Sequence, residues 1–362
     1  MGFNCGLVGL PNVGKSTIFN ALTAVGAKVE SFPFSTVKTN VGVVTVPDGR
    51  LERLAALYPE KEKVPTTLEF MDIAGLVRGA HEGEGLGNQF LAEIRNVDAI
   101  LHIVRCFEDP NVAHVDGSLD PRRDIEVVEL ELLLKDLETL ENALEKIRRK
   151  AHAGDREAAK EQDLLERVKG EVERGTAVRE LELAEEERAH LRGLGLLTEK
   201  PVLFVANVGD EEEVAYSRVV AEAARERGAG FIAIPGELEM EIAEAAESEE
   251  ERAEYRREWG LEESGLERLI RAGYELLDLI TFFTTDGPEV RAWTVKRGTK
   301  APQAGAKIHT DFEKRFIQAE VVPVEVLLEK GSLQALKEAG LLQRVGGDYE
   351  VQDGDVIHFV VA

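Results

Sequence analysis

The stretch that decides the fold is Gly9-Leu10-Pro11-Asn12-Val13-Gly14-Lys15-Ser16. It matches the pattern Gly-x-x-x-x-Gly-Lys-Ser/Thr, a loop whose backbone N–H groups cradle phosphate oxygens. The apolar run 3–8 before the loop predicts a buried strand, and residues 17–24 after it predict a helix. A helix that starts at such a loop points its positive end at the anion. This context favours a phosphate-binding loop over an ordinary glycine-containing turn.

The residues of this loop predict a nucleotide site that uses magnesium. Lys15 is expected to reach the β- and γ-phosphates and to act in catalysis, and the Ser16 hydroxyl is expected to ligate Mg²⁺. The residues predicted to bind nucleotide here are Asn12, Val13, Gly14, Lys15, Ser16 and Thr17. Asn12 has two open interpretations. It either caps the loop or ligates K⁺ beside the phosphates, as Asn does at this position in related K⁺-activated NTPases.

A second motif, Asp72-Ile73-Ala74-Gly75, follows the strand-like run 67–71 and begins 57 residues after Lys15 (72 − 15). Asp-x-x-Gly at this distance is typical of GTPase-type P-loop proteins, in which the Asp steadies the Mg²⁺ shell and the Gly N–H meets the γ-phosphate. We therefore predict Asp72 as a metal-site residue and Gly75 as a catalytic one. Between the two motifs, Thr36 is either a further Mg²⁺ ligand or an ordinary loop threonine.

The base-binding motif is expected at Asn207-Val208-Gly209-Asp210, directly after the strand-like run 201–206. It occupies the place of Asn-Lys-x-Asp in GTPases, so Asn207, Val208 and Asp210 are predicted to bind the base. Asp210 could accept hydrogen bonds from guanine N1–H and N2–H₂, a donor pair that adenine lacks. Val208, however, has no lysine stem to cover the base, and residues 233–236 lack the Ser-Ala-Lys that helps GTPases bind guanine. These features favour ATP and leave GTP or GDP open.

Asn207 follows Asp72 at a distance of 135 positions (207 − 72), which is too long for one or two strand–helix units and indicates an insertion. Apolar residues alternate steps of three and four along its first half, at Leu130, Leu133, Leu137, Leu140, Leu144 and Ile147. This heptad seam, a turn at 153–155 and a second apolar series from Leu164 to Leu181 predict an antiparallel coiled-coil arm, or else a pair of core helices. The tip is either a solvated turn or a phosphate-binding surface. Its basic residues are Lys146, Arg148, Arg149, Lys150, His152, Arg156 and Lys160.

A third unit, a small α+β domain, is expected from about residue 278 onward. The strand-like runs are 280–284, 290–295 and 356–361, and a helix is expected at 304–310. Residues 291–315 include seven basic side chains and only Asp311 and Glu313 as acids, a local charge of +5 (7 − 2). This stretch contrasts with the acidic chain as a whole.

The composition restricts the setting of the protein. The chain has 362 residues, of which 43% are apolar, enough for two or three domains with real cores. Its net charge of −25 (44 − 69) argues against non-specific nucleic-acid binding, so no DNA partner is expected. The sequence has neither a run of about 20 apolar residues, as a membrane span requires, nor a signal-peptide pattern. Cys5 and Cys106 are expected to be buried free thiols, which suits a cytoplasmic protein.

Several segments resemble a known family. Residues 72–88 resemble the extended switch II of Obg-type P-loop NTPases, and the segments 291–294, 307–313 and 353–356 resemble a TGS domain, a β-grasp module. Together the motifs resemble the YchF family of Obg-like ATPases over essentially the whole chain. The resemblance implies an α/β P-loop G domain with a mostly parallel sheet and helices on both faces. The expected boundaries are 1–126 and 196–277 for the G domain, 127–195 for the inserted coiled-coil arm and 278–362 for the TGS domain.

The resemblance also implies a function. We expect a cytosolic, Mg²⁺-dependent ATPase that is a nucleotide-dependent switch in translation or the stress response, with GTP or GDP binding also open. It would bind the large ribosomal subunit or the intact 70S ribosome through the arm tip and the TGS domain. The family's Asn-x-x-Glu ends here in Asp210, which keeps the choice of base uncertain. Two other classes stay open: a guanine-specific Obg-type GTPase, and a ribosome- or RNA-binding module that nucleotide stabilises with negligible turnover.

The group that orients the attacking water is the least defined part of the expected site. Leu76, after Gly75, cannot hydrogen-bond a water, so another residue must orient it. His114 matches a loop histidine proposed for this role in the family. The alternative is a loop histidine whose ring is satisfied by ordinary hydrogen bonds.

Overall fold

The computed structural model describes residues 2–25, 28–31, 40–76, 79–80, 86–152, 155–209, 214–246, 248–261 and 263–362. Two residues of the predicted site, Thr36 and Asp210, lie outside the described residues. Internal contacts divide the chain into two compact units. The first unit contains residues 3–43 and 69–269, and the second contains residues 44–68 and 270–362. In the described part of the chain, no helix is both long and apolar enough to cross a membrane.

Among the described residues of the first unit, strands form one sheet in the order β2-β3-β5-β1-β6-β7-β8. The strands are β1 (Asn4–Val8), β2 (Lys28–Ser31), β3 (Asn40–Thr45), β5 (Thr67–Asp72), β6 (Ala99–Cys106), β7 (Val202–Val208) and β8 (Gly230–Ile234). β1 pairs parallel with β5 and β6, β7 pairs parallel with β6 and β8, and β2 runs antiparallel to β3. Every residue of β6 is buried, as expected for a parallel strand covered on both faces. The predicted P-loop G domain with its mostly parallel sheet is confirmed.

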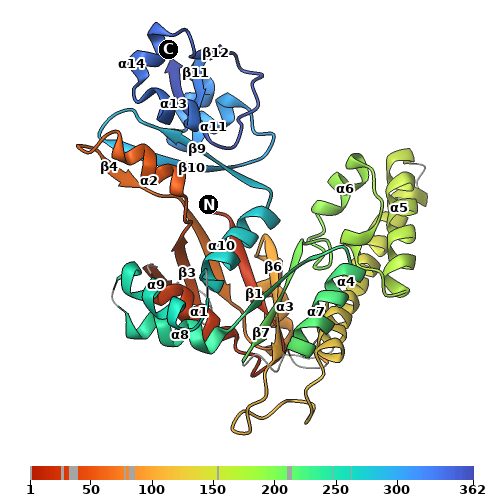
Figure 1. The fold of residues 1–362 in the computed structure, drawn as a ribbon. Coiled ribbons are helices and arrows are strands. Elements are labelled where there is room, and N and C mark those ends of the chain that lie inside the picture. The colour runs from red at the N-terminus through yellow and green to blue at the C-terminus, as the bar shows by residue number, and fades with distance from the viewer. Residues whose placement is uncertain are drawn as a thin grey trace. The chain divides into compact units, whose positions relative to one another are not determined.

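Helices cover both faces of this sheet. In Figure 1, α1 and α8 lie on one side of the strands, and α4 and α7 lie on the other. The helices of this unit are α1 (Lys15–Ala24), α3 (Leu86–Arg95), α4 (Pro121–His152), α5 (Arg156–Glu173), α6 (Glu185–Arg192), α7 (Val214–Glu226), α8 (Gly236–Ala245), α9 (Glu249–Glu258) and α10 (Gly265–Leu276), which ends in the second unit. α1 contacts both β1 and α8, so the helix that follows the glycine-rich loop is fixed from two sides.

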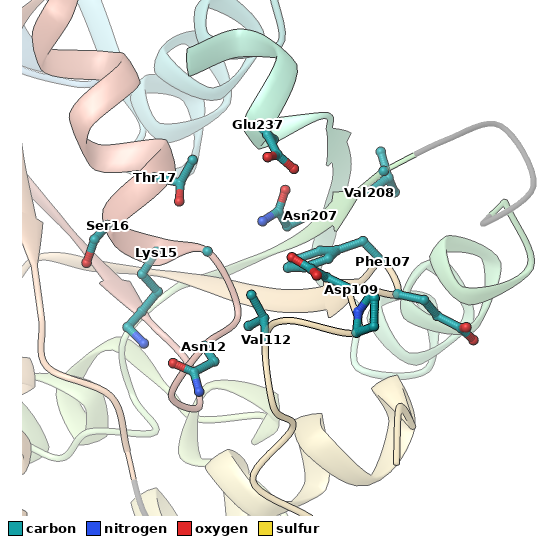
Figure 2. A pocket seen from close by; sticks show the side chains of 14 residues that line it. Asn12, Lys15, Ser16, Thr17, Phe107, Asp109, Val112, Asn207, Val208 and Glu237 are labelled. Carbon is teal, nitrogen blue, oxygen red and sulfur yellow. The ribbon is translucent and has the colours of Figure 1, made fainter. Parts of the chain in front are cut away.

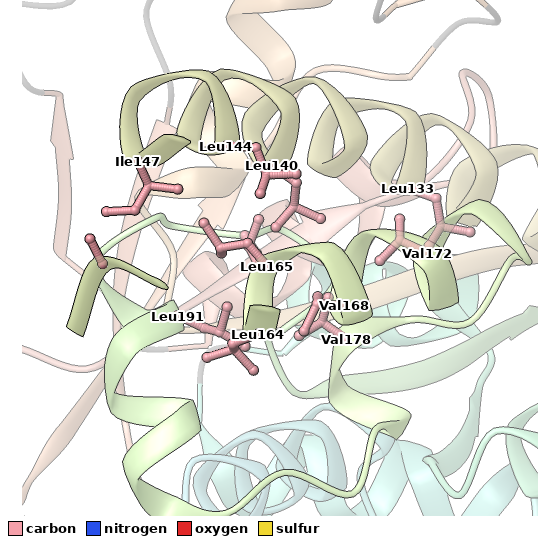
Figure 3. Close-up of a cluster of buried hydrophobic side chains, with 12 residues drawn as sticks. Leu133, Leu140, Leu144, Ile147, Leu164, Leu165, Val168, Val172, Val178 and Leu191 are labelled. Carbon is pink, nitrogen blue, oxygen red and sulfur yellow. The ribbon is translucent and has the colours of Figure 1, made fainter. Parts of the chain in front are cut away.

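The predicted helical arm is a hairpin of α4 and α5 around one hydrophobic cluster (Figure 3). The cluster joins residues of both helices with others from the segment that follows: Leu133, Leu140, Leu144, Ile147, Leu164, Leu165, Val168, Val172, Val178, Leu191 and Leu196. The first half of α4 instead packs on β6 and α7, with Ile125 and Val128 fully buried. The first half of α4 is therefore a core helix, and its second half is one of the two helices of the arm. Each of the two interpretations of the sequence, core helix and coiled-coil arm, describes one half of α4.

Two details of the predicted arm are wrong. Leu130 does not belong to the buried seam, since it is 54% exposed, because the part of α4 where it lies packs on the sheet through other faces. The second helix ends at Glu173 and does not extend to Leu181. Gly175 has a φ of 89°, and the N–H of Thr176 donates to the carbonyl of Glu171, which stops the helix. The chain then turns back through a short 3₁₀ helix, Val178–Glu180.

Within the second unit, the described strands form one sheet in the order β12-β11-β13-β9-β10-β4. The strands are β4 (Glu62–Val64), β9 (Leu279–Thr284), β10 (Glu289–Lys296), β11 (Phe316–Pro323), β12 (Gln343–Val345) and β13 (Asp355–Val361). The helices are α2 (Gly49–Ala56), α11 (Ala301–Ile308), α12 (Asp311–Arg315), α13 (Val324–Lys330) and α14 (Leu333–Glu338). The three strands expected from the sequence are present. The helix expected at 304–310 begins and ends earlier, at 301–308.

One part of the expected domain division differs from these units. Residues 44–68 were expected in the nucleotide domain, but they pack with residues 270–362. β4 pairs parallel with β10, and Leu51 and Leu54 of α2 join the hydrophobic cluster of Phe283. Arg50 also forms an ion pair with Asp353 at 2.7 Å. The partners of this stretch lie more than 200 residues away in sequence, so no local pattern indicated them. The three expected domains themselves stay a prediction.

Candidate nucleotide-binding site

The glycine-rich loop connects the end of β1 to the start of α1, as its sequence predicts. Gly14 has a φ of 89° and Asn12 a φ of 62°, so both adopt the left-handed conformation. A Cβ atom on Gly14 would lie 2.1 Å from the Asn207 Nδ2, and one on Gly9 would lie 2.4 Å from the carbonyl oxygen of Ile103. A side chain at either glycine would therefore clash with a neighbouring atom, and the left-handed conformation of Gly14 is a second reason why glycine is required there.

Lys15 is the first residue of α1 and is buried at the phosphate end of the site. Its Nζ donates hydrogen bonds to the carbonyl oxygens of Gly9, at 3.1 Å, and Leu10, at 2.8 Å. Burial lowers the pKa of Lys15 from 10.5 to about 8, against an opposing effect of the Asp72 carboxylate. A phosphate beside this ammonium would favour its charged form. The loop thus holds a desolvated cation where an anion is expected.

Two of the three residues predicted to hold Mg²⁺, Ser16 and Asp72, are in direct contact. The Ser16 hydroxyl donates to the Asp72 Oδ2 at 3.0 Å, which joins the start of α1 to the end of β5. Burial raises the pKa of Asp72, while the hydrogen bond from Ser16 and the charge of Lys15 oppose the rise. A hydroxyl and a carboxylate oxygen are ligands that Mg²⁺ prefers, with phosphate oxygens and waters completing its shell. The residues present therefore fit Mg²⁺. Thr36, the third predicted ligand, lies outside the described residues.

Asn207, the last residue but one of β7, ties two loops of the site together. Its Nδ2 donates to the carbonyl of Val13 at 3.0 Å, and its Oδ1 accepts from the N–H of Gly236 at 3.0 Å. Asn207 is only 4% exposed. A Cβ on Gly236 would lie 2.7 Å from this Oδ1, so the start of α8 also approaches Asn207 too closely for a side chain at this position. The predicted base-binding asparagine is thus also a structural bridge.

These residues border a cavity of about 550 Å³ (Figure 2). The residues that line it are Asn12, Gly14, Lys15, Ser16, Thr17, Phe107, Glu108, Asp109, Pro110, Val112, Asn207, Val208, Gly209 and Glu237. The structure therefore brings together most of the predicted phosphate and base residues. Lys15 and Ser16 lie at one end, and Asn207, Phe107 and Glu237 lie at the other. The polar end suits phosphates and the end with Phe107 suits a planar base.

Comparison with known proteins identifies the family. Residues 4–149 match the family model of the 50S ribosome-binding GTPase, and residues 279–362 match a YchF C-terminal model described as a protein of unknown function. The ribosome-binding ATPase YchF of Escherichia coli O157:H7 is 49% identical over 362 residues, which cover 99% of both chains. The protein of that name in Bacillus subtilis strain 168 is 47% identical over 364 residues, again 99% of both chains. The chain belongs to the YchF family.

A solved structure supports the same assignment at the level of the fold. The Schizosaccharomyces pombe YchF GTPase superposes with a TM-score of 0.86 at 35% identity, covering 99% of this chain and 98% of that chain. The G domain, helical hairpin and C-terminal β domain of this chain are therefore those of the YchF family. The family resemblance seen in the sequence motifs is confirmed.

The loop after β6 contains cavity residues that sequence reasoning missed: Phe107, Glu108, Asp109, Pro110 and Val112. Arg105 fixes this loop. Its guanidinium lies 4.5 Å from the centroid of the Phe107 ring, and it donates to the carbonyls of Phe107 at 3.1 Å and Val112 at 2.9 Å. No motif indicated these residues. Their place directly after a parallel strand is a usable signal, because ligands bind at the carboxyl ends of such strands. Glu237, in the first turn of α8, was missed too.

His114, the predicted water-orienting residue in this YchF protein, has both ring nitrogens in hydrogen bonds. Its Nδ1 accepts from the N–H of Asp116 at 3.1 Å, and its Nε2 lies 2.8 Å from the Oδ2 of Asp124. The proton is therefore on Nε2, which donates to Asp124. His114 would have to release one of these partners before it could hold a water. Its catalytic role stays a prediction.

Gly75 lies against the phosphate loop. A Cβ on Gly75 would lie 3.0 Å from the backbone N and Cα of Pro11. The next residue, Leu76, donates its N–H to the carbonyl of Gly9 at 3.0 Å. The Asp-x-x-Gly segment is therefore held on the phosphate loop, and its contact with a γ-phosphate stays a prediction. Asp210, the predicted base-binding carboxylate, lies outside the described residues.

Proposed function

We propose that this protein is a Mg²⁺-dependent ATPase that binds the ribosome and works in the cytoplasm as a nucleotide-dependent switch in translation. The observation on which this rests is the cavity that has Lys15 and Ser16 at one end and Asn207 and Phe107 at the other. The Ser16 hydroxyl at this cavity also donates to the carboxylate of Asp72. The names of the bacterial relatives, ribosome-binding ATPases at 47% and 49% identity, support the same activity. The Schizosaccharomyces pombe relative is named a GTPase, so the names of the relatives do not agree on the base.

Hydrolysis would depend on charge and alignment. Mg²⁺ would be held through Ser16 and Asp72, with Thr36 as a further ligand, and would supply charge stabilisation at the phosphates. Lys15 would hold its ammonium beside the β- and γ-phosphates, where it neutralises charge that develops during phosphoryl transfer. The Gly75 N–H would donate to the γ-phosphate. Turnover would be slow until a partner frees the ring of His114, because this ring is held by Asp116 and Asp124.

Two features favour adenine over guanine. The Gly236 N–H, at the start of α8, already donates to Asn207 and is not free for a 6-oxo group. The carboxylate of the next residue, Glu237, borders the same end of the cavity (Figure 2). A carboxylate accepts a hydrogen bond from the 6-amino group of adenine and repels the 6-oxo group of guanine. Asp210, if it faced N1 and N2 instead, would favour guanine. Titrating ATP, GTP and GDP calorimetrically into nucleotide-free protein separates these cases.

A monovalent cation is the finer part of this proposal. The Asn12 Nδ2 donates to the carbonyl of Ala113 at 3.1 Å, which leaves the side-chain oxygen as the atom that could ligate K⁺. A cation there would add positive charge beside the α- and γ-phosphates, as an arginine finger does elsewhere. The alternative, that Asn12 only caps the loop, predicts equal hydrolysis in KCl and NaCl.

The ribosome contact is proposed at the arm tip and the C-terminal TGS-like domain. Arg149 and Lys160 at the tip have side-chain exposures of 83% and 75%. Both also pair with neighbouring glutamates, at 3.5 Å and 2.9 Å, so the tip is less positive than its basic residues alone suggest. Phosphates of ribosomal RNA would replace these weak surface pairs. Reversing the charge at Arg149 and Lys160 should weaken ribosome binding and reduce its salt dependence. Unchanged affinity and salt slope would remove the tip from the interface.

A further inference from the structure

We propose that α4 couples the arm to the nucleotide site, with Asp124 and Glu131 as positioning residues that hold two loops of that site. Both are carboxylates on the first half of the helix, and both are buried, at 2% and 4% exposure. They are seven residues apart, which is about two helical turns, so they lie on one face of α4. Burying carboxylates is costly unless they are hydrogen-bonded. Each accepts a hydrogen bond from a different segment of the site.

Asp124 holds the loop that lines the cavity. Its Oδ2 accepts from the His114 Nε2 at 2.8 Å. Ala113, the residue before His114, accepts a hydrogen bond from the side chain of Asn12 in the phosphate loop at 3.1 Å. A displacement of Asp124 therefore moves His114 and its neighbour against the phosphate loop. It also decides whether the His114 ring is free to meet a water.

Glu131 holds the segment that follows the Asp-x-x-Gly motif. Its Oε1 accepts from the backbone N–H of Gly79 at 2.6 Å. Gly79 has a φ of 78° and lies four residues after Gly75. At the near end of this segment, Leu76 donates to the carbonyl of Gly9. Leu76 is therefore tied to the phosphate loop and Gly79 to α4. Because both residues follow Gly75 within four positions, γ-phosphate contacts at Gly75 bear on the bond to Glu131.

The same helix continues into the arm without a break. α4 contains 32 residues and extends from Pro121 to His152. Midway, Asp136 is fully buried and accepts from the Leu197 N–H at 2.7 Å and the Thr198 N–H at 2.8 Å, which makes a fixed point on the helix. Beyond it, Leu140, Leu144 and Ile147 pack in the hairpin. A load on the arm would tilt a stiff helix about Asp136 and change the two contacts at its other end.

This inference rests on the proposed nucleotide binding and makes a reciprocal prediction. If the arm biases the loops, then nucleotide must bias the arm by the same free energy. The readout is the ratio of two ribosome dissociation constants, measured with a non-hydrolysable ATP analogue and with ADP. A second readout, hydrogen exchange across residues 137–172 with and without the ATP analogue, uses neither ribosomes nor turnover. In the wild-type chain the ratio should differ from one by about 5-fold or more, and exchange in the arm should respond to nucleotide.

The variants are Asp124→Ala and Glu131→Ala, with Asp124→Asn and Glu131→Gln as rescues that keep an accepting oxygen. Glu129→Ala is the matched control: Glu129 is also buried on α4, but its partner is Arg179. Both alanine variants should bring the ratio close to one and abolish the nucleotide response of the arm. The rescues and Glu129→Ala should keep both. Melting curves measure the loss of stability in each alanine variant. Because Glu129→Ala should lose stability as well, a loss of coupling that is confined to Asp124→Ala and Glu131→Ala does not come from lower stability.

Three outcomes would overturn the coupling. They are no nucleotide response in the wild-type arm together with a ratio of one, full coupling in both alanine variants, or equal loss in Glu129→Ala. Failure of the proposed function looks different. In that case the wild-type protein releases no phosphate from ATP, while bound nucleotide still changes exchange in the arm and Glu131→Ala still abolishes that change.

Discussion

Replacing Asn207 by alanine tests whether the site is held together as described. The change removes two buried hydrogen bonds, to the carbonyl of Val13 and from the N–H of Gly236. Each net hydrogen bond contributes about 1 kcal/mol, and each buried polar group left without a partner costs about 1–3 kcal/mol. Water from the adjoining cavity can reach the space that the amide leaves, which favours the lower values. We therefore expect the free energy of unfolding to fall by about 2–4 kcal/mol.

Urea denaturation followed by circular dichroism measures this loss, and calorimetric titration measures nucleotide affinity in parallel. Because the Val13 carbonyl belongs to the phosphate loop, the substitution should also reduce the free energy of ATP binding. A reduction of about 2 kcal/mol in that binding free energy corresponds to about 30-fold weaker binding. Val208→Ala is the control, since Val208 borders the same cavity without either hydrogen bond. It should cost about 1 kcal/mol or less. A change within about 0.5 kcal/mol for Asn207→Ala, the range of ordinary surface substitutions, would refute the bridge.

Three further predictions concern charge and base choice. Burial lowers the pKa of Lys15 to about 8 and phosphate would raise it again, so ATP binding at pH 9 should take up close to one proton. Above pH 8 the affinity should fall about tenfold per pH unit, and Lys15→Ala should abolish both the uptake and tight binding; pH-independent binding in the wild type would contradict the assignment. Glu237→Ala should weaken ATP selectively and Asp210→Ala should weaken GTP selectively, each by about 1–3 kcal/mol in competition titrations; equal losses for both nucleotides would mean that neither residue reads the base. Hydrolysis should be several-fold faster in KCl than in NaCl at equal ionic strength, and Asn12→Ala should remove the difference; equal wild-type rates in both salts would exclude a K⁺ site.

The parts of the site that the sequence predicted are those in which a contiguous pattern encodes the contact. The phosphate loop follows β1, and Asp72 and Asn207 lie at the carboxyl ends of β5 and β7. A parallel sheet brings the carboxyl ends of its strands to one edge. The buried seam of the arm could also be predicted from the sequence, because the periodicity of a helix is a local pattern. The family resemblance then joined these pieces into one architecture.

The missed parts depend on contacts that no local pattern encodes. Phe107 lines the cavity in a loop that Arg105 holds through its contacts with the ring and the carbonyl of Phe107. The ion pair of Arg50 with Asp353 joins residues 303 apart in sequence and draws α2 into the second unit. Leu130 satisfied the heptad pattern but is exposed, since the pattern does not show where α4 changes from the sheet to the hairpin.

Phosphate release by the full-length chain, with and without 70S ribosomes, tests the central claim most directly. The assay compares MgATP with MgGTP and uses Lys15→Ala as the background. We predict turnover of ATP above that background, a further increase on adding ribosomes, and slower turnover of GTP. Wild-type release equal to that of Lys15→Ala in the presence of ribosomes would contradict the account, as would faster turnover of GTP than of ATP.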